Sequence, residues 1–350
     1  MRDSQVMLSV IMPVYNGEKY LEESVWSVLN QPEKDLVLIV VNDGSTDNTQ
    51  ELIEKLLKKD HRVIVIQQEQ SGVSVARNKG IVKSLEIGAK YIAFLDADDV
   101  WCKGIYCKKT LDILKLEEFD LIGFDYYNGT EDLLRGNRVA SLVTLLKDCW
   151  PVSNHFCSFF YSTKILIEFK FFFPEHVKLY EDGAFLTLFA FYSKRYKNFH
   201  ECAFIYRNNP YSVTHKKENS LNTYFVSFLS AWDWLAEMLD KDNQNIESIK
   251  SIKRTYLIEF IQQACMYGKK LNWIKNMING YSNGMKLLND NSVFISEKNS
   301  RTLVFFLRYP VIFKTKNRLK GIWFEIRQLF KRFKVFNCIY YKATIKDIHF

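Results

Sequence analysis

Three aspartates stand within four positions at the end of a short apolar run, in the segment Asp96-Ala97-Asp98-Asp99. Carboxylates this close repel one another unless a cation or a network of hydrogen-bond donors lies between them. Hard oxygen ligands of this kind suit Mg²⁺ or Mn²⁺, which commonly bridge to the phosphates of a substrate. The spacing therefore predicts a divalent-cation site, and an exposed acidic turn is the alternative interpretation.

Polar segments that contain glycine follow three other apolar runs, at residues 13–17, 42–47 and 71–72. In parallel sheets, ligands bind beyond the carboxyl ends of the strands. We therefore expect these three segments to line one cleft together with Asp96–Asp99.

Apolar strands and amphipathic helices alternate over the first hundred residues. This alternation indicates a parallel sheet that is covered on both faces. The predicted fold class is α/β, with a Rossmann-like, mostly parallel sheet and flanking helices. The expected strands are 8–12, 36–41, 62–66, 91–95, 121–124 and 155–161, and the expected helices are 20–29, 47–57, 74–85, 184–192, 224–239 and 246–267.

The composition of the 350-residue chain is that of a globular protein, with 47% apolar residues. Its seven cysteines form no Cys-x-x-Cys pair, which indicates reduced thiols in a cytoplasmic compartment. The first apolar run lacks the features of a signal peptide. No run approaches the ~18 apolar residues of a membrane-spanning helix. We therefore expect a cytoplasmic protein without a membrane span.

Neither a G-x-G-x-x-G loop nor a Walker-type loop is present in the sequence. This disfavours a nicotinamide dehydrogenase and a P-loop kinase. The expected cleft offers carboxylates, which bind phosphate through a metal or accept hydrogen bonds from ribose and base. A nucleoside diphosphate held through a divalent cation fits these groups.

Four segments in order resemble family 2 glycosyltransferases of the A-type fold: 9–16, 40–47, 72–80 and 94–99. Weaker motifs at Glu181-Asp182, Tyr206-Arg207 and 212–214 extend the resemblance to about residue 215. The resemblance implies a catalytic domain over 1–215, with a nucleotide-sugar half at about 8–100 and an acceptor half at about 101–215. A smaller, mainly helical region would occupy 216–350.

The resemblance implies that Pro13, Tyr15 and Asp43 form the pocket for a uracil-type base, with Glu18 beside it. A simple strand-ending turn is the alternative for Pro13 and Tyr15. The family usually has two acids before Gly-Ser, whereas this chain has Asn42 before Asp43. The second acid makes the base contact, so the pocket is expected to persist.

For the rest of the donor, the resemblance implies that Arg77 approaches the base or the diphosphate and that Asp96 accepts from ribose. Arg207 would contact the diphosphate. Asp98 would bind the metal, Mn²⁺ or Mg²⁺. For Arg77 alone, an exposed helix arginine is the alternative, and Asp99 has two open roles, as a metal ligand or as a cap of the next segment.

Asp182 resembles the catalytic base of the family, with Glu181 as the other candidate. Asp182 would take a proton from an acceptor hydroxyl, which attacks the anomeric carbon and inverts it, while the metal stabilises the leaving diphosphate. Asp182 as the N-cap of a helix that starts near Gly183 is the alternative. His215 is a further candidate for the metal shell. No Gln-x-x-Arg-Trp motif of processive synthases is present, which favours transfer of one sugar per visit.

Basic and aromatic residues alternate near the end of the sequence, notably over 323–334. Residues 301–350 contain 12 Lys and Arg but only two acids, Glu325 and Asp347. On a helix, the aromatic residues of this segment would group on one side. A helix of this kind is expected to lie in the interface of a membrane that carries anionic lipid. Nucleic-acid binding and packing on the catalytic domain are the alternatives.

The sequence thus predicts a peripheral enzyme on the inner face of the bacterial plasma membrane. It would transfer one sugar from a nucleotide-sugar, in particular a UDP-sugar, to a lipid-linked saccharide carried on polyprenyl diphosphate. The product would belong to capsule, O-antigen or exopolysaccharide synthesis. A nucleotidyltransferase is one alternative, but Asn16-Gly17-Glu18 is not the Gly-rich, basic loop that it needs. A non-catalytic, membrane-associated module that binds nucleotide-sugars is the other.

Overall fold

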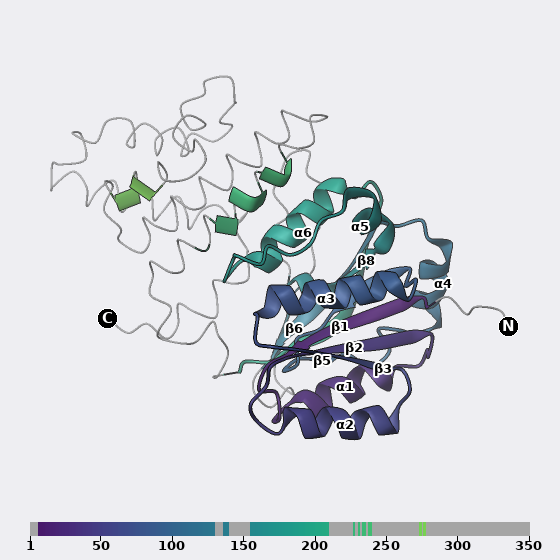
Figure 1. Cartoon of the computed structure of the whole chain (residues 1–350). Helices are drawn as coiled ribbons and strands as arrows, with labels where there is room; N and C mark the ends of the chain where they lie inside the picture. The colour runs from purple at the N-terminus through teal and green to yellow at the C-terminus, as the bar shows by residue number, and fades with distance from the viewer. Residues whose placement is uncertain are drawn as a thin grey trace. The chain divides into compact units, whose positions relative to one another are not determined.

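The computed structural model describes residues 6–129, 136–139 and 155–209, together with scattered helical positions between 227 and 277. The chain forms two compact units, Met1–Ser220 and Leu221–Phe350, and the first contains the sheet (Figure 1). The basic aromatic segment 323–334 and most of the expected helices beyond residue 220 lie outside the described residues.

Helices and strands alternate through the first half of this unit, as the sequence predicts. The elements are β1 (Leu8–Val14), α1 (Leu21–Leu29), β2 (Leu36–Asp43), α2 (Thr49–Lys59), β3 (Val63–Gln68), α3 (Val73–Glu86) and β4 (Tyr91–Phe94). Strands β3, β2, β1 and β4 are neighbours in that order and all pair in parallel. Helix α3 covers one face of these strands, and α1 and α2 lie on the other (Figure 1). The predicted α/β fold is confirmed.

The second half continues the same sheet with mixed strand directions. Its elements are β5 (Val100–Trp101), α4 (Lys108–Leu116), β6 (Leu121–Gly129), β7 (Gly136–Val139), η1 (Phe156–Ser158), β8 (Phe159–Ser162), α5 (Thr163–Phe169), α6 (Glu181–Tyr192) and β9 (Tyr196–Tyr206). Strand β8 pairs antiparallel with both β4 and β6, whereas β6 and β9 are parallel. Strand β8 therefore joins the first, parallel half of the sheet to the second half.

Two expected elements differ in detail from the structure. The strand expected over 155–161 begins only at Phe159, because Ser158 N donates to the His155 carbonyl and closes a 3-10 turn. The helix expected from Ala184 begins at Glu181, after Tyr180 in a left-handed conformation (φ 70°). Asp182 is therefore in the first turn of α6 and is not its N-cap.

A close contact fixes α3 on the sheet. A Cβ added to Gly80 would lie 2.3 Å from Ile11 Cγ2 in β1, so only glycine lets the helix come this near. One turn later, the Ser84 and Ser9 hydroxyls form a buried 2.8 Å hydrogen bond between the same two elements. This packing sets the position of Arg77, which lies one turn before Gly80 on α3.

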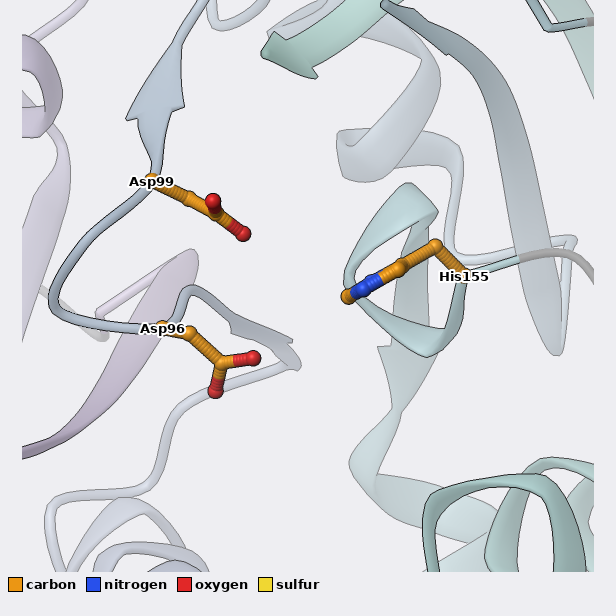
Figure 2. A group of neighbouring side chains, drawn as sticks. All are labelled: Asp96, Asp99 and His155. Atoms are coloured by element: carbon orange, nitrogen blue, oxygen red, sulfur yellow. The ribbon is translucent and has the colours of Figure 1, made fainter. Parts of the chain in front are cut away.

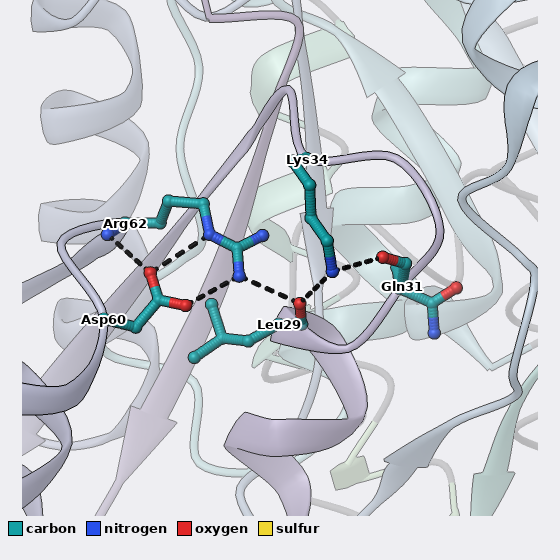
Figure 3. A network of polar contacts seen from close by, with 5 residues as sticks. All are labelled: Leu29, Gln31, Lys34, Asp60 and Arg62. Atoms are coloured by element: carbon teal, nitrogen blue, oxygen red, sulfur yellow. Dashed lines mark hydrogen bonds and ion pairs between the residues drawn. The ribbon is translucent and has the colours of Figure 1, made fainter.

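Helix α1 ends without a basic residue in its last turn, and cations from other segments bind its carbonyls. Lys34 Nζ and Arg62 Nη2 each donate to the Leu29 carbonyl at 2.9 Å (Figure 3). Arg62 also forms a 2.6 Å ion pair with Asp60. Positive charge at a helix C-terminus is stabilising, and this network anchors α1 to the beginning of β3.

Aromatic rings fill the core of the second half of the sheet unit. Phe94 at the end of β4 has its ring centroid 5.3–5.8 Å from those of four other rings: Phe156, Tyr161, Phe173 and Phe185. These rings come from η1, β8, the segment before α6, and α6 itself. The cluster therefore holds the beginning of α6 near the end of β4, where the aspartates follow.

Candidate active site

The segment Asp96–Asp99 leaves the end of β4 as a tight turn, in which Asp99 N donates to the Asp96 carbonyl at 3.0 Å. Asp99 is fully buried, so the segment is not an exposed acidic turn. Its Oδ1 accepts from the backbone N–H of Arg207 at 2.8 Å. Asp98 Oδ2 accepts from the Asn209 side chain at 2.9 Å. The residues that follow β9 therefore hold the acidic segment in place.

Arg207 binds protein groups on several sides. Its Nε donates to the Asp98 carbonyl at 2.8 Å, its Nη2 pairs with Glu23 at 2.5 Å, and its guanidinium lies 4.4 Å from the Tyr20 ring centroid. Its side chain is only 5% exposed. These contacts connect the acidic segment to α1. The expected contact between Arg207 and the diphosphate stays a prediction.

Asp96 and Asp99 lie close to His155, which immediately precedes η1 (Figure 2). One potential ligand atom from each of the three residues lies within 4.8 Å of the others. Asp99 Oδ2 and His155 Nδ1 are both buried and have no hydrogen-bond partner in the described part of the chain. Two carboxylates and an imidazole are suitable ligands for a divalent transition metal, so this donor set fits a cation.

Burial shifts the pKa values of the groups in and beside this cluster. Burial, together with the charges of Asp98 and Asp96, raises the pKa of Asp99 well above its ordinary value. Burial and the charge of Asp96 also raise the pKa of Asp98. Burial lowers the pKa of His155, so its imidazole is held in the neutral form that binds metals. A bound cation would oppose the raised pKa values by favouring the ionised carboxylates, and it would bind the imidazole in its neutral form.

The sequence did not single out His155. Its ring is buried against those of Tyr126, Phe204 and Tyr206, at centroid distances of 5.8, 5.1 and 4.8 Å. It reaches Asp99 only because β8 inserts next to β4, and no local pattern signals that pairing. Asp98, the predicted metal ligand, is outside this three-residue cluster, although Asp96 and Asp99 belong to it.

Arg77 connects the acidic segment to the beginning of α6. Its Nη2 donates to Asp96 at 3.0 Å, and its Nη1 donates to Glu181 at 2.8 Å. The guanidinium also lies 4.3 Å from the centroid of the Phe156 ring. Burial alone would lower the pKa of Arg77, but the charges of Asp96 and Glu181 raise it above its ordinary value. Arg77 is thus a buried ionic bridge and not an exposed helix arginine.

Glu181 and Asp182, the two candidate bases, have different surroundings. Glu181 is 8% exposed and bound to Arg77, and burial followed by the charge of Asp182 raises its pKa to about 7. Asp182 is partly exposed, and its Oδ1 accepts only from the adjacent Gly183 N–H among the contacts described. Asp182 is therefore the more accessible to an acceptor hydroxyl.

The predicted base pocket lies where β1 and β2 end, and the loops there are bonded to each other. Asn16 Oδ1 accepts from the Thr46 N–H at 2.8 Å. Pro13 is buried opposite Val41 in the sheet, whereas the Tyr15 side chain is 45% exposed. The structure thus brings these two segments together at one edge of the sheet, as the sequence predicts.

Asp43 and Glu18 both bind backbone N–H groups. Asp43 accepts from the Ser71 and Gly72 N–H groups at 2.7 and 2.9 Å, so it fixes the loop that leads into α3. Glu18 accepts from the backbone and side chain of Asn48, both at 3.0 Å. Asp43 therefore holds the loop that precedes α3, and Glu18 holds the residue that precedes α2.

Comparison with known proteins decides the family. Residues 9–183, half of the chain, match the profile of Glycosyl transferase family 2. The chain is a family 2 glycosyltransferase. The segments with the strongest resemblance, the Asp96–Asp99 turn and Glu181-Asp182 all lie within the matched range.

Bacterial glycosyltransferases are among the relatives of this enzyme. EpsJ of Bacillus subtilis (strain 168), described as an uncharacterized glycosyltransferase, is 30% identical over 221 residues, which cover 59% of this chain and 63% of EpsJ. TuaG of the same organism, whose name refers to teichuronic acid biosynthesis, is 42% identical over 98 residues, covering 28% of this chain and 38% of TuaG. The chain thus spans less than two thirds of either relative.

Solved structures show the same fold. The glycosyltransferase superposes on TarS 1–349 of S. aureus in complex with UDP with a TM-score of 0.66, at 21% identity, over 86% of this chain and 87% of TarS 1–349. The TM-score for the complex of TarS with UDP-GlcNAc is 0.67. At this level of identity the similarity establishes the A-type fold of the catalytic unit.

Two predicted features of the glycosyltransferase lie beyond the described residues. His215, the further candidate for the metal shell, is one, and the membrane-associating segment 323–334 is the other. Among the helices that the structure describes, none is both long and apolar enough to cross a membrane.

Proposed function

We propose that this glycosyltransferase moves a single sugar, with inversion, from a UDP-sugar to a hydroxyl of a lipid-linked saccharide in bacterial surface-polysaccharide synthesis. The observation that supports this most directly is the Arg77 bridge. One guanidinium binds Asp96 on the donor side and Glu181 next to the proposed base. Donor and acceptor chemistry would therefore meet at a single point of the sheet edge.

On the donor side, Pro13, Tyr15 and Asp43 form the pocket for the uracil ring. Asp96 is partly exposed and its second carboxylate oxygen is available to ribose, since Oδ1 is the atom bound to Arg77. Asp98 is proposed to bind the divalent cation in the donor complex. A cation held there would supply charge neutralisation for the leaving diphosphate.

On the acceptor side, Asp182 takes the proton of the acceptor hydroxyl. The oxygen attacks the anomeric carbon from the face opposite the diphosphate, the bond to the diphosphate breaks, and the anomeric configuration inverts. Arg77 keeps Glu181 engaged, so Asp182 is left to accept the proton. A positioned base of this kind contributes about 10²–10⁴ to the rate.

The nature of the substrates is supported by the relatives. TarS was solved with UDP and with UDP-GlcNAc, and the name of TuaG refers to teichuronic acid biosynthesis. The basic aromatic segment 323–334 would keep the enzyme on the inner face of the plasma membrane, near a polyprenyl-diphosphate-linked acceptor.

A donor panel tests the proposal. Purified full-length chain is incubated with UDP-, GDP- and dTDP-sugars, Mn²⁺ or Mg²⁺, and a lipid extract from polysaccharide-producing bacteria, and released nucleoside diphosphate is measured. We expect release from a UDP-sugar that depends on acceptor and is abolished by EDTA. Release only from another nucleotide class would overturn the donor assignment. Metal-dependent binding of UDP-sugars without any release would favour the non-catalytic module.

A further inference from the structure

Asn78 lies on α3 directly after Arg77, and its buried side chain binds the backbone of a segment that is distant in the sequence. Its Oδ1 accepts from the Phe173 N–H at 2.8 Å, and its Nδ2 donates to the Phe173 carbonyl at 3.0 Å. Nδ2 also donates to Glu175 Oε1 at 3.0 Å. A carboxamide has two N–H donors and one carbonyl acceptor, so these contacts engage both donors and the acceptor of Asn78.

The segment that Asn78 binds leads into α6. Residues 170–180 form neither a helix nor a strand, so no regular pattern of hydrogen bonds pairs their backbone groups. Phe173 is only 2% exposed, and buried backbone N–H and C=O groups must be hydrogen-bonded. Asn78 provides both bonds from the neighbouring helix. Its side chain therefore does for Phe173 what an adjacent strand does for a residue in a sheet.

The ring of Phe173 extends this contact to α6. It stacks on the ring of Phe185, with the centroids 4.0 Å apart and an angle of 5° between the planes. Phe185 lies one turn after Glu181 in α6. The Phe173 centroid is also 5.3 Å from the Arg77 guanidinium. Two successive residues of α3 thus hold the beginning of α6, Arg77 through Glu181 and Asn78 through Phe173.

We propose that Asn78 is a positioning residue for sugar transfer, because it fixes the first turn of α6 and with it the carboxylate of Asp182. The proposal rests on the proposed function, in which Asp182 is the base. Among the contacts that the structure describes, those of Asn78 involve no residue of the predicted donor site. A change at Asn78 therefore acts on the transfer step and not on donor binding. A misplacement of about 1 Å in a reacting group can cost ~10²-fold in rate.

Asn78→Asp tests the proposal in the full-length chain. Aspartate has nearly the same size, but it replaces the donors by a carboxylate oxygen that faces the Phe173 carbonyl and Glu175. We expect the single-turnover rate at saturating substrates to fall at least ~10-fold, while the Kd of the UDP-sugar changes less than about threefold. Amide hydrogen exchange should become faster in the first turn of α6. Asn78→Ser, which adds no charge, serves the same test if Asn78→Asp folds poorly.

Thr163→Val is the matched control for the loss of buried hydrogen bonds. The Thr163 hydroxyl is buried and lies 2.8 and 2.9 Å from the carbonyl oxygens of Ala89 and Lys90, in the turn between α3 and β4. Thr163→Val should lower the midpoint of urea unfolding without a loss of rate per folded molecule. Equal rate losses in Thr163→Val and Asn78→Asp would overturn the proposal, because general destabilisation would then explain both.

A double-mutant cycle with Asp182→Asn separates positioning from a purely structural role. If Asn78 acts through Asp182, Asn78→Asp should slow transfer much less in the Asp182→Asn chain than in the original chain. Equal losses in the two backgrounds would contradict the proposal, and so would an unchanged rate in both Asn78→Asp and Asn78→Ser. Full turnover in the single variant Asp182→Asn would instead remove the base assignment of the proposed function, so the two failures are told apart.

Discussion

Arg77 and Glu181, 104 positions apart in the chain, form a 2.8 Å ion pair in which the side chains are only 5% and 10% exposed. The same guanidinium holds Asp96 at 3.0 Å. Because burying charges is costly unless each is paired and hydrogen-bonded, this arrangement persists only while both halves of the catalytic unit are in place. The ion pair thus connects α3 to α6, the helix with the proposed base.

Arg77→Lys should separate the two contacts. A lysine keeps the charge but lacks the planar fork, so it can bind Asp96 or Glu181 but not both in the present geometry. We expect a loss of about 1–3 kcal/mol in the free energy of unfolding and at least a ~10-fold loss in kcat. Urea unfolding and release of nucleoside diphosphate measure the two effects.

Arg62→Lys is the matched control, because Arg62 also forms a fork with an acid, Asp60, but at the far end of α1 (Figure 3). It should lose stability without loss of kcat per folded molecule. Equal kcat losses in Arg77→Lys and Arg62→Lys would show that the contacts of Arg77 with Asp96 and Glu181 do not contribute specifically to turnover.

Asp182→Asn and Glu181→Gln should differ in turnover. Without its carboxylate, Asp182 cannot take the acceptor proton, and we expect kcat to fall by ~10²–10⁴ while UDP-sugar binding is kept. Glu181→Gln retains a neutral acceptor for Arg77, so its kcat should stay within about tenfold of the original chain. Single-turnover rates and calorimetric titration with the donor measure both. The reverse order of the two losses would make Glu181 the base.

Stability should decrease as the pH rises past the titration of Glu181. Burial and the charge of Asp182 raise its pKa from 4.5 to about 7, so between these values the folded chain binds more protons than the unfolded chain. The contribution of Glu181 is therefore fully present below about pH 4.5 and is lost as the pH rises through about 7. Its size is on the order of 3 kcal/mol, because one pKa unit corresponds to about 1.4 kcal/mol.

The comparison of the original chain with Glu181→Gln, by urea unfolding in EDTA from pH 5 to pH 8, isolates this contribution from those of the other buried acids. The difference in unfolding free energy between the two chains should change across this range in favour of the variant at high pH. Parallel pH profiles would show that the Arg77 charge keeps Glu181 ionised throughout.

The sequence predicts the elements from β1 to β4 well because their signals are local. Strands β1 and β2 are apolar at nearly every position, and α3 follows a glycine at the expected place. In contrast, β9 alternates irregularly between buried and exposed residues, and the expected elements do not include it. Its position depends on pairing with β6 across a register shift, which is a long-range property.

The same distinction applies to the site. The spacing of the carboxylates indicates a site, but no local pattern indicates which residues contact them. His155 reaches Asp99 through the antiparallel insertion of β8, and Arg207 N–H reaches the same carboxylate from the end of β9. These contacts follow from strand order, which hydrophobic periodicity does not encode.

Gly80→Ala should destabilise the catalytic unit although alanine is the better helix former. The new methyl would lie 2.3 Å from Ile11 Cγ2, and Ile11 is fully buried in β1, so α3 must move away from the sheet. Overpacking of this kind costs about 1–3 kcal/mol.

Gly183→Ala in α6 is the matched control, because a Cβ there meets nothing within 4 Å. Urea unfolding should show a loss for Gly80→Ala and little change or a gain for Gly183→Ala. Since Arg77 lies on the displaced helix, Gly80→Ala should also weaken donor binding, whereas unchanged stability would mean that α3 does not pack on β1 this closely.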